Sequence, residues 1–400
     1  MSESAEIPSS FVFVICQAGA EAAARKEILG LKNVPFAPLK LAFSRPGFLT
    51  FKVNPENPPP ERFSLPSTLA RTYGWSLGKV KGTDAGELVG EVCANEHVRQ
   101  CRTLHVYQRE TAVPGNAGFE PGVSPLAAEV AGLFETESER NGHVVSVNRV
   151  APTDSLVADI VMVSPDEWWY GFHHAVTRQG RWPGGVPLFD TQSERTSRAY
   201  FKLKEALLWS GISIAPGDVC AEIGSAPGGA CELLLELGAK VIAVDPAEME
   251  PEIEQNSDVT WIRRRGHEVR KRDFSKVRWL MADLNIAPKY TLDTVRDIVN
   301  HESVNVAGML LTLKVNDWDL IDEVPAYISL VKSWGFQVVR TRQLAFNRRE
   351  FCLMAARDKF ALRDARRKSR IKREGFSPKD ESPANDSSVE GSPSSDSTDV

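Results

Sequence analysis

The stretch from Asp218 to Gly229 constrains the fold more than any other part of this 400-residue chain. It reads Asp-Val-Cys-Ala-Glu-Ile-Gly-Ser-Ala-Pro-Gly-Gly, so an apolar run leads into a turn rich in glycine. A helical pattern follows, and a second apolar run, Lys240-Val-Ile-Ala-Val-Asp245, ends on an acid. This order is typical of the nucleotide-binding end of a β-α-β unit in a Rossmann-like fold.

The chemistry of the turn narrows the choice of ligand. Its spacing is not the Gly-x-Gly-x-x-Gly of dinucleotide sites. Pro227 also removes a backbone donor that a diphosphate would need. Gly224 lets the backbone approach a ligand closely, because no side chain intervenes. These features favour a nucleoside without phosphates, of which S-adenosylmethionine is the common one.

Asp245 follows Gly224 by 21 positions, at the end of the second apolar run. Rossmann-like folds place an acid at this point to hydrogen-bond the ribose hydroxyls of the ligand. The alternative is a helix cap in front of Pro246. We favour the ligand role, because the glycine turn and the acid support each other.

From Ser197 onward, helical and strand patterns alternate. A helix is predicted at 199–209, and strands are predicted at 219–223, 241–244, 277–282, 308–313, 336–339 and 351–355. This order predicts an α/β domain over 197–373, with a doubly wound and mostly parallel sheet. The tail 374–400 is rich in Ser, Pro and Asp and is expected to be disordered.

Two smaller blocks precede this domain. Residues 1–85 show strand and helix patterns that predict a small α+β, ferredoxin-like block, in which Ser67–Tyr73 is expected to be helical. Residues 86–176 combine strands, a helix at 127–141 and a hairpin around Ser164-Pro165-Asp166. Because the second block has no catalytic motif, we interpret it as a binding or positioning module.

Residues 177–196 are predicted to link the two halves of the chain. The segment Arg178-Gln-Gly-Arg-Trp-Pro-Gly-Gly-Val-Pro187 is rich in residues that interrupt regular structure. Two interpretations are equally open. The segment is a plain linker, or it lines a substrate channel in which Trp182 stacks on a base and its two arginines pair with phosphates.

The net charge of −5 conceals a strong segregation of charge along the chain. Residues 261–278 contain eight Lys or Arg against two acids, and 357–373 contain nine against two. Residues 374–400 contain seven acids against one lysine. Two basic segments beside a nucleotide-binding fold suggest RNA, whose phosphates dominate affinity. Each segment taken alone is slightly better explained as a solvated helix face.

Other classes of protein are disfavoured. No run of about 18 apolar residues is present, so no transmembrane helix is expected. The first residues lack the basic and apolar regions of a signal peptide, and we expect a cytoplasmic protein.

The six cysteines form no Cys-x-x-Cys or Cys/His cluster, so structural zinc is not expected. Cys16, Cys220 and Cys352 lie in apolar runs and are interpreted as core residues.

Polar side chains stand at the ends of three predicted strands. Asp283 and Lys314 each close an apolar run, and Glu350 precedes one. Ligands bind at the carboxyl ends of strands in open α/β sheets, so Asp283 and Lys314 are expected to face one crevice. Lys202 lies on the helix before the glycine turn. A lone lysine after a strand is more often a surface residue, but two lysines and two acids at equivalent edges favour a site.

Five segments together resemble the FtsJ-like RNA 2′-O-ribose methyltransferases. They are Ser197-Arg-Ala-Tyr-Phe-Lys-Leu-Lys-Glu205, the Gly-Ser-Ala-Pro-Gly-Gly turn, Ala282-Asp283, Leu313-Lys314 and Arg349-Glu350. That family carries a Lys-Asp-Lys-Glu tetrad. Position by position, the tetrad falls on Lys202, Asp283, Lys314 and Glu350.

Within this family, the chain is most similar to the RlmM type, which methylates a cytidine of 23S ribosomal RNA. The segments Tyr170-Gly171, Val259-Thr-Trp-Ile-Arg263 and 343–350 carry this likeness. The family has a THUMP-containing region before its catalytic domain, which implies a THUMP-like RNA-binding block at 86–176. The resemblance is strong over about 169–355 and weak before that.

The resemblance implies S-adenosyl-L-methionine as cofactor and RNA as partner, with no metal. The implied cofactor-binding residues are Ser197, Glu222, Gly224, Ser225, Ala226, Pro227, Gly228, Gly229, Asp245 and Asp283. Glu222 stands where the family usually has Asp, and Ala226 is a small replacement inside the turn. Arg265 occupies the place of an acid that meets the adenine amine. A cation cannot accept that bond, so the backbone of Arg265 or Gly266 would have to supply it.

The implied reaction is direct methyl transfer to a ribose 2′-hydroxyl, for which the enzyme aligns the oxygen and removes its proton. Lys314 would be the general base. It must be neutral to accept a proton, and burial beside Lys202 is expected to lower its pKa. Asp283 and Glu350 would orient the lysines, and Lys202 would steer the hydroxyl or a nearby phosphate.

Two rival functions remain. An NAD-dependent oxidoreductase shares the β-α-β unit, but the missing Gly-x-Gly-x-x-Gly and the proline in the turn disfavour it. A non-catalytic RNA-binding protein of the same fold is the other, motivated by Arg265. The N-terminal blocks would hold RNA, so removing residues 1–175 is expected to reduce RNA affinity more than cofactor affinity.

Overall fold

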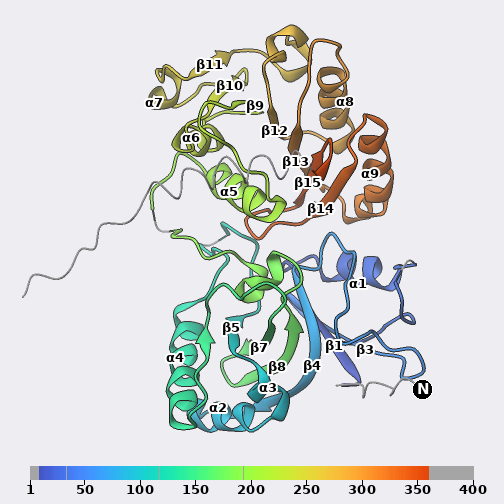
Figure 1. Ribbon diagram of the computed structural model, residues 1–400, viewed down its shortest axis with the longest axis vertical. Coiled ribbons are helices and arrows are strands. Elements are labelled where there is room, and N and C mark those ends of the chain that lie inside the picture. The colour runs from blue at the N-terminus through green and yellow to red at the C-terminus, as the bar shows by residue number, and fades with distance from the viewer. Residues whose placement is uncertain (1–8, 33, 117, 192, 360–400) are drawn as a thin grey trace, which may run out of the picture.

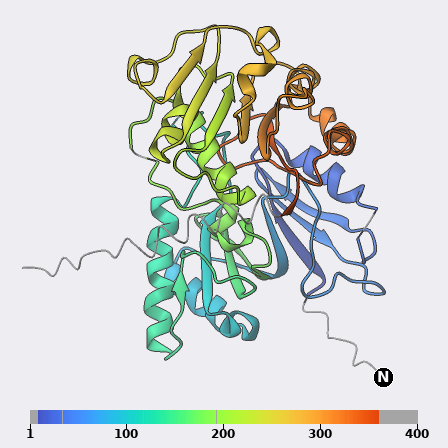
Figure 2. The same ribbon diagram turned by 45° about the horizontal axis from the view of Figure 1, so that its top comes forward.

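A computed structural model describes residues 9–32, 34–116, 118–191 and 193–359. Two β-sheets lie one above the other, and each has its own helices (Figures 1 and 2). The N-terminal half of the chain builds the lower sheet of Figure 1, and the C-terminal half builds the upper one. The predicted tail at 374–400 and the basic residues 360–373 lie outside the described residues.

The N-terminal sheet has eight strands in the order β2-β3-β1-β4-β8-β7-β5-β6. Their bounds are β1 Phe11–Ile15, β2 Lys40–Arg45, β3 Phe48–Lys52, β4 Thr72–Lys81, β5 Thr103–Gln108, β6 Ser146–Val147, β7 Leu156–Ser164 and β8 Glu167–His174. Neighbouring strands are antiparallel, except that β5 runs parallel to β6 and to β7. The hairpin predicted around Ser164-Pro165-Asp166 is confirmed as β7 and β8.

The blocks predicted at 1–85 and 86–176 share this one sheet. Strand β4 of the first block pairs with β8 of the second, with Trp75 opposite Phe172. Both side chains are buried in a common core. Each block alone would leave a strand edge of this sheet unpaired. The boundary expected near residue 85 therefore does not separate two sheets.

The helix predicted at Ser67–Tyr73 is wrong, because strand β4 already begins at Thr72. The carboxylate of Glu27 accepts hydrogen bonds from the backbone N–H groups of Thr68, at 2.7 Å, and Leu69, at 3.1 Å. A distant side chain thus satisfies donors that a helix would have used. Periodicity in the local sequence does not reveal such a partner.

Four α-helices accompany the N-terminal sheet. They are α1 Glu21–Leu29, α2 Ala85–Cys93, α3 Glu96–Gln100 and α4 Pro125–Arg140. Side-chain caps explain where three of them begin, since Asp84, Asn95 and Ser124 each accept backbone N–H groups of the first turn. Helix α4 confirms the helix predicted at 127–141.

The segment between the two halves packs against the N-terminal sheet. It contains two short 3₁₀ turns, η1 Gln179–Arg181 and η2 Pro183–Gly185. Nε2 of His173 lies 2.6 Å from the carbonyl oxygen of Gly180, and Trp182 is only 7% exposed. A buried indole cannot stack on a base, so of the two interpretations the packing favours the linker over the channel.

The C-terminal sheet has seven strands in the order β11-β10-β9-β12-β13-β15-β14. Their bounds are β9 Val219–Ile223, β10 Lys240–Val244, β11 Val259–Ile262, β12 Trp279–Asp283, β13 Gly308–Lys314, β14 Val338–Arg342 and β15 Glu350–Ala356. Strands β11, β10, β9, β12 and β13 are parallel, and β15 is antiparallel to both of its neighbours. The mostly parallel α/β sheet predicted from the alternating pattern is confirmed.

Helices flank this sheet (Figure 1), and along the chain most of them lie between two of its strands. The α-helices are α5 Ala199–Ser210, α6 Gly229–Glu236, α7 Pro251–Glu254, α8 Pro288–Val299 and α9 Val324–Ser333. Three 3₁₀ segments complete the half: η3 Gly266–Glu268, η4 Lys271–Phe274 and η5 Trp318–Glu323. Because β9, β10, β12 and β13 are parallel, their carboxyl ends lie at the same edge of the sheet.

The end of β14 and the loop that follows it join the two halves through buried polar groups. Arg342 donates to the carbonyls of Arg71, at 2.9 Å, and Gly185, at 2.8 Å. The backbone N–H of Gln343 donates to the carbonyl of Thr68 at 2.7 Å. Because Arg342 and Gln343 are at most 2% exposed, these bonds fix how the halves meet.

Within the described ranges, no helix has the length and apolar character needed to cross a membrane. The same residues contain no group of three or more His, Cys, Asp or Glu side chains that could hold a metal ion. Cys16, Cys220 and Cys352 are buried, as predicted for core residues.

Candidate active site

The glycine turn joins the end of β9 to the start of α6. Gly224 has φ of 85°, and a Cβ atom added there would lie 2.5 Å from the carbonyl oxygen of Asp283. Gly228 has φ of 125°, and an added Cβ would meet Ile253 at 2.9 Å. Both positions therefore require glycine, because a side chain would be strained and would collide with its neighbours.

A cavity of about 680 Å³ opens at this turn. Gly224, Ala226, Asp245 and Asp283 line it, so four of the predicted cofactor residues come together there. The carboxylate of Asp245 accepts from the backbone N–H of Ala226 at 3.2 Å and of Ala247 at 2.8 Å. These bonds hold the carboxylate at the wall of the cavity, beside the turn.

Other predicted cofactor residues lie outside this lining. Ser225 is buried with its hydroxyl 3.7 Å from the sulfur of Met249. Pro227 precedes Gly228, the N-cap of α6, and Gly229 is the first residue of that helix. Ser197 lines a different cavity. Its Oγ would lie 2.2 Å from a Cβ added to Gly229, which makes it a packing partner of the turn.

Glu222 is also outside the cavity, on the buried strand β9. It lines a small space of about 30 Å³ that Lys202 and Asp283 also line. Its Oε2 atom has no hydrogen-bond partner among the described residues. Burial, reinforced by the negative charge of Asp283, raises the pKa of Glu222 well above its ordinary range. Its predicted contact with the methionine amine stays a prediction.

The lining of the cavity at the glycine turn also includes residues that the sequence analysis missed. Arg265 and Gly266 line it as expected, and helix α8 adds Tyr290, Asp293, Thr294 and Asp297. The spacing of these four along α8 places them on one helical face, and this was the signal available in the sequence. The carboxylates of Asp293 and Asp297 can accept hydrogen bonds, whereas the guanidinium group of Arg265 can only donate them.

Lys202, Asp283, Lys314 and Glu350 meet in one cluster. Lys314 Nζ lies 2.8 Å from Oδ1 of Asp283 and 2.5 Å from Oε2 of Glu350. Lys202 Nζ lies 3.1 Å from Oδ2 of Asp283 and 2.5 Å from Oε1 of Glu350. Each lysine therefore bridges both carboxylates, and the formal charges of the four groups cancel. The strand ends explain the geometry, since Lys314 and Glu350 are direct cross-strand partners of β13 and β15.

The electrostatics of this cluster correct one expectation. Burial alone would lower the pKa of Lys314, but Asp283 and Glu350 raise it above its ordinary value. The expectation that Lys202 depresses this pKa is wrong, because two carboxylates lie in contact with the ammonium group. Burial would likewise raise the pKa of Asp283, but Lys202 and Lys314 lower it.

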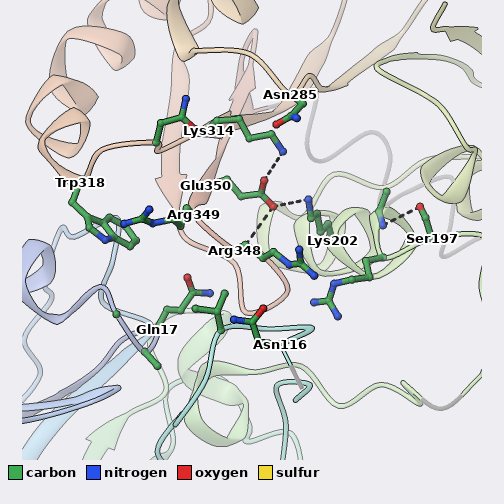
Figure 3. A pocket seen from close by; sticks show the side chains of 16 residues that line it. Gln17, Asn116, Ser197, Lys202, Asn285, Lys314, Trp318, Arg348, Arg349 and Glu350 are labelled. Atoms are coloured by element: carbon green, nitrogen blue, oxygen red, sulfur yellow. Dashed lines mark hydrogen bonds and ion pairs between the residues drawn. The ribbon is translucent and has the colours of Figure 1, made fainter. Parts of the chain in front are cut away.

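A second cavity, of about 870 Å³, opens over the cluster and is lined from both halves of the chain. In Figure 3, Lys202 and Lys314 both point toward Glu350, and Gln17 and Asn116 of the N-terminal half face them across the cavity. Asn285, just after β12, lines both this cavity and the one at the glycine turn. A ligand at the turn and a ligand over the cluster would therefore meet at the end of β12.

Comparison with known proteins shows which family and which relatives this chain is similar to. Residues 195–333 match the model of the FtsJ-like methyltransferase family. The ribosomal RNA large subunit methyltransferase M of Hahella chejuensis is 27% identical over 184 residues, which are 43% of this chain and 46% of that protein. The protein of the same name from Halorhodospira halophila is 27% identical over 183 residues, 45% of this chain and 52% of that one. The match thus spans about half the length of these curated relatives.

Solved structures match over part of the chain. A fibrillarin pre-rRNA processing protein of Methanococcus jannaschii aligns with a TM-score of 0.32 and 12% identity, over 49% of this chain and 81% of that one. An S-adenosylmethionine-dependent methyltransferase structure from Listeria monocytogenes aligns with a TM-score of 0.31 and 10% identity, over 40% and 97%. Likeness at this level does not identify a function.

The resemblance to the FtsJ-like family is thus confirmed over residues 195–333. Three of the four clustered residues, Lys202, Asp283 and Lys314, lie inside this range, and Glu350 lies beyond it.

Proposed function

We propose that this protein transfers a methyl group from S-adenosylmethionine to a ribose 2′-hydroxyl of RNA. The finer proposal is a cytidine of 23S ribosomal RNA. The relatives' names support large-subunit ribosomal RNA, and the resemblance to the RlmM type implies the cytidine. The observation that carries the proposal is the contact between the two cavities. Asn285 lines both of them, beside a cluster of two lysines and two carboxylates.

The residues at the glycine turn suit the proposed cofactor. Gly224 leaves room where a Cβ atom would collide, which allows a nucleoside to approach the backbone. Asp245 presents a carboxylate for ribose hydroxyls, and Asp293 and Asp297 offer acceptors for an adenine amine. S-adenosylmethionine, when bound, supplies a methyl group on a sulfonium, which is already a good leaving group.

The chain's own residues then have two tasks, to align the 2′-oxygen and to accept its proton. Lys314 and Lys202 border the second cavity, where a ribose would lie. We assign proton acceptance to Nζ of Lys314 in its neutral form. The carboxylates of Asp283 and Glu350 stabilise the ammonium group that results, which makes the neutral amine a strong base. The same contacts keep that neutral form scarce at neutral pH.

The N-terminal half is assigned the task of holding RNA. We propose that it is a THUMP-containing region, with 86–176 as the THUMP-like part and 1–85 as the ferredoxin-like part of the same sheet. Residues 177–196 serve as the linker, 197–373 as the methyltransferase domain and 374–400 as an acidic tail. A ribosomal RNA substrate would place the reaction in the cytoplasm.

The proposal is tested by incubating the full chain with methyl-labelled S-adenosylmethionine and fragments of 23S ribosomal RNA. Mass spectrometry of the digested RNA then identifies 2′-O-methylated nucleosides. Lys314→Ala is expected to lose activity while still binding S-adenosylhomocysteine. Lys332→Ala, which alters an exposed lysine of α9, serves as the matched control.

Each rival function predicts a different outcome. Tight binding of NAD in place of S-adenosylmethionine would favour an oxidoreductase. RNA binding without methyl transfer, on any RNA tested with bound cofactor, would favour a non-catalytic RNA-binding protein.

A further inference from the structure

Two guanidinium groups, from Arg198 and Arg348, lie together on the wall of the larger cavity. A Cβ atom added to Gly115 would lie 2.5 Å from Nη2 of Arg348 and 3.2 Å from Nη1 of Arg198. Both groups therefore cover the same glycine, which has φ of 80°. Figure 3 shows Arg348 on this wall, near Lys202 and Asn116. Residues from both halves of the chain build the cluster.

Negative charge is scarce around this pair. Arg198 forms an ion pair with Glu120, and Nε of Arg348 donates to the carbonyl of Pro114 at 3.0 Å. Nη2 of Arg198 is buried and has no hydrogen-bond partner among the described residues. Burial and the positive charge of Arg348 lower the pKa of Arg198. Glu350 also attracts Arg198, but among the described residues only Glu120 forms an ion pair with either guanidinium group, and at least one donor is left over.

We propose that Arg198 and Arg348 bind a phosphodiester group of the RNA strand, next to the ribose that is methylated. Guanidinium groups bind phosphate through paired hydrogen bonds, and a buried unpaired donor is best satisfied by such an anion. This inference rests on the proposed function, because it takes the ribose to lie over Lys202 and Lys314.

The spacing along the chain supports a phosphate adjacent to that ribose. Arg198, the residue just before α5, precedes Lys202 by four residues, about one helical turn or ~6 Å along the helix axis. Arg348 precedes Glu350 by two residues. The same short segments thus present one pair of side chains to the ribose and the other pair to its neighbouring phosphate. Contacts of this kind position a strand without reading its sequence.

Glu120 has a place in this arrangement. Its carboxylate occupies Arg198 in the absence of RNA, and its second oxygen has no partner among the described residues. A phosphate entering the site would compete with this carboxylate for the guanidinium group. Removing the charge of Glu120 is therefore expected to strengthen RNA binding, whereas removing an arginine weakens it.

The test measures binding of a short, fluorescein-labelled single-stranded RNA of mixed sequence by the full chain over a series of salt concentrations. Arg348→Ala is expected to weaken binding about tenfold and to lower the slope of log Kd against log salt by about 0.7–1. Glu120→Gln is expected to tighten binding. Lys332→Ala is the control, because that exposed lysine lies on α9 of the C-terminal half and does not line the cavity.

If neither Arg348→Ala nor Glu120→Gln changes affinity or salt slope, the phosphate site is refuted. The opposite effects of the two variants also separate a charge contact from loss of folding, which would weaken binding in both. A parallel methylation assay distinguishes the two proposals. Methylation with unchanged salt slopes overturns only the phosphate site, and altered slopes without methylation of any RNA overturn only the proposed function.

Discussion

Gln17 donates a 2.6 Å hydrogen bond from its side-chain amide to the backbone carbonyl of Asn347. The side-chain amide of Asn347 in turn donates to Oε1 of Glu350 at 3.3 Å. Gln17 and Asn347 are at most 1% exposed, so both bonds are made away from water. The N-terminal half therefore reaches a carboxylate of the lysine-carboxylate cluster through a single intervening residue.

Substituting Gln17 is expected to lower turnover through Glu350. Gln17→Ala leaves the buried carbonyl of Asn347 without its donor, which costs about 1–3 kcal/mol and lets the loop shift. We expect kcat to fall about tenfold while the Kd for S-adenosylhomocysteine stays unchanged, because Gln17 does not line the cofactor cavity.

Gln337→Ala is the matched control for this variant, since Gln337 is an exposed glutamine of the C-terminal half. Single-turnover rates and calorimetric titration provide the two readouts. A change in KM for RNA with an unchanged kcat would show that Gln17 contacts RNA and does not position Glu350. The same link means that removing residues 1–175 is expected to impair turnover as well as RNA affinity.

The role of Lys314 as proton acceptor can be tested by a substitution that keeps the positive charge but cannot lose its proton. Arginine stays protonated in proteins, so Lys314→Arg retains an ion pair with Asp283 and Glu350 but cannot accept a proton. We expect Lys314→Arg and Lys314→Ala to lower the single-turnover rate similarly, by about 10²–10⁴. Substantial activity in Lys314→Arg alone would mean that Lys314 supplies only positive charge.

The rate of methyl transfer is expected to rise with pH. Asp283 and Glu350 raise the pKa of Lys314 above its ordinary value, so the ammonium form predominates at neutral pH. The neutral fraction then grows about tenfold for each pH unit, without a plateau between about pH 7 and 9. Single-turnover rates at saturating RNA and cofactor measure this. A rate independent of pH would exclude neutral Lys314 as the proton acceptor, provided that chemistry limits the rate.

The raised pKa of Lys314 makes the stability of the fold fall at high pH, whereas it makes the reaction rate rise. A lysine whose pKa is raised in the folded state stabilises the fold at all pH values below the unfolded pKa of about 10.4. That contribution is lost only as the pH rises through the higher folded value. The protein therefore stays folded over the range in which the rate is measured, as far as this group is concerned, and circular dichroism at each pH checks this.

Asp245 is expected to determine cofactor affinity. Replacing a carboxylate that hydrogen-bonds ribose hydroxyls costs about 1.5–3 kcal/mol, or about ten- to a hundredfold in Kd. Asp245→Ala is therefore expected to weaken binding of S-adenosylhomocysteine in calorimetric titration, with RNA affinity unaffected. Asp258→Ala is the control, an exposed aspartate next to β11. Equal affinities in the two variants would assign Asp245 to the turn alone, through its bonds to Ala226 and Ala247.

The sequence predicted the lysine-carboxylate cluster because strand ends are a local feature. Asp283 and Lys314 each end a parallel strand, and the sheet itself brings such ends to one edge. The pKa of Lys314 was predicted with the wrong sign, because it depends on how many carboxylates contact one nitrogen. That number is set by the pairing of β13 with both β12 and β15, which periodicity does not reveal.

Contacts between segments that are distant in the sequence account for the other features that the sequence did not predict. Gln17 and Asn347 are 330 positions apart, and nothing near either one marks the pair. Glu27 likewise satisfies the backbone of 68–69, where a helix had been predicted. The acids of α8 did have a detectable spacing, but a helix face near a cofactor is recognised only when its position relative to the sheet is known.

Glu222 provides the last test, because its predicted contact with the cofactor and its burial require opposite charge states. Burial and Asp283 raise its pKa, so the folded protein favours the neutral acid. The unfolded chain ionises above about pH 4.3, and stability is therefore lost as the pH rises from there toward the folded value. Glu222→Gln removes this loss, since the amide is neutral and of similar shape.

We therefore expect the free energy of unfolding to decline less steeply with pH in Glu222→Gln than in the wild type. Urea denaturation at about pH 5, 6 and 7 measures this difference. Cofactor affinity is expected to be unchanged, because Glu222 lines a separate small space and does not line the cavity at the glycine turn. If S-adenosylhomocysteine binds Glu222→Gln at least tenfold more weakly, Glu222 is ionised and meets the methionine amine. Burial would then be a poor guide to its charge in the bound protein, since a ligand ammonium group would supply the missing partner.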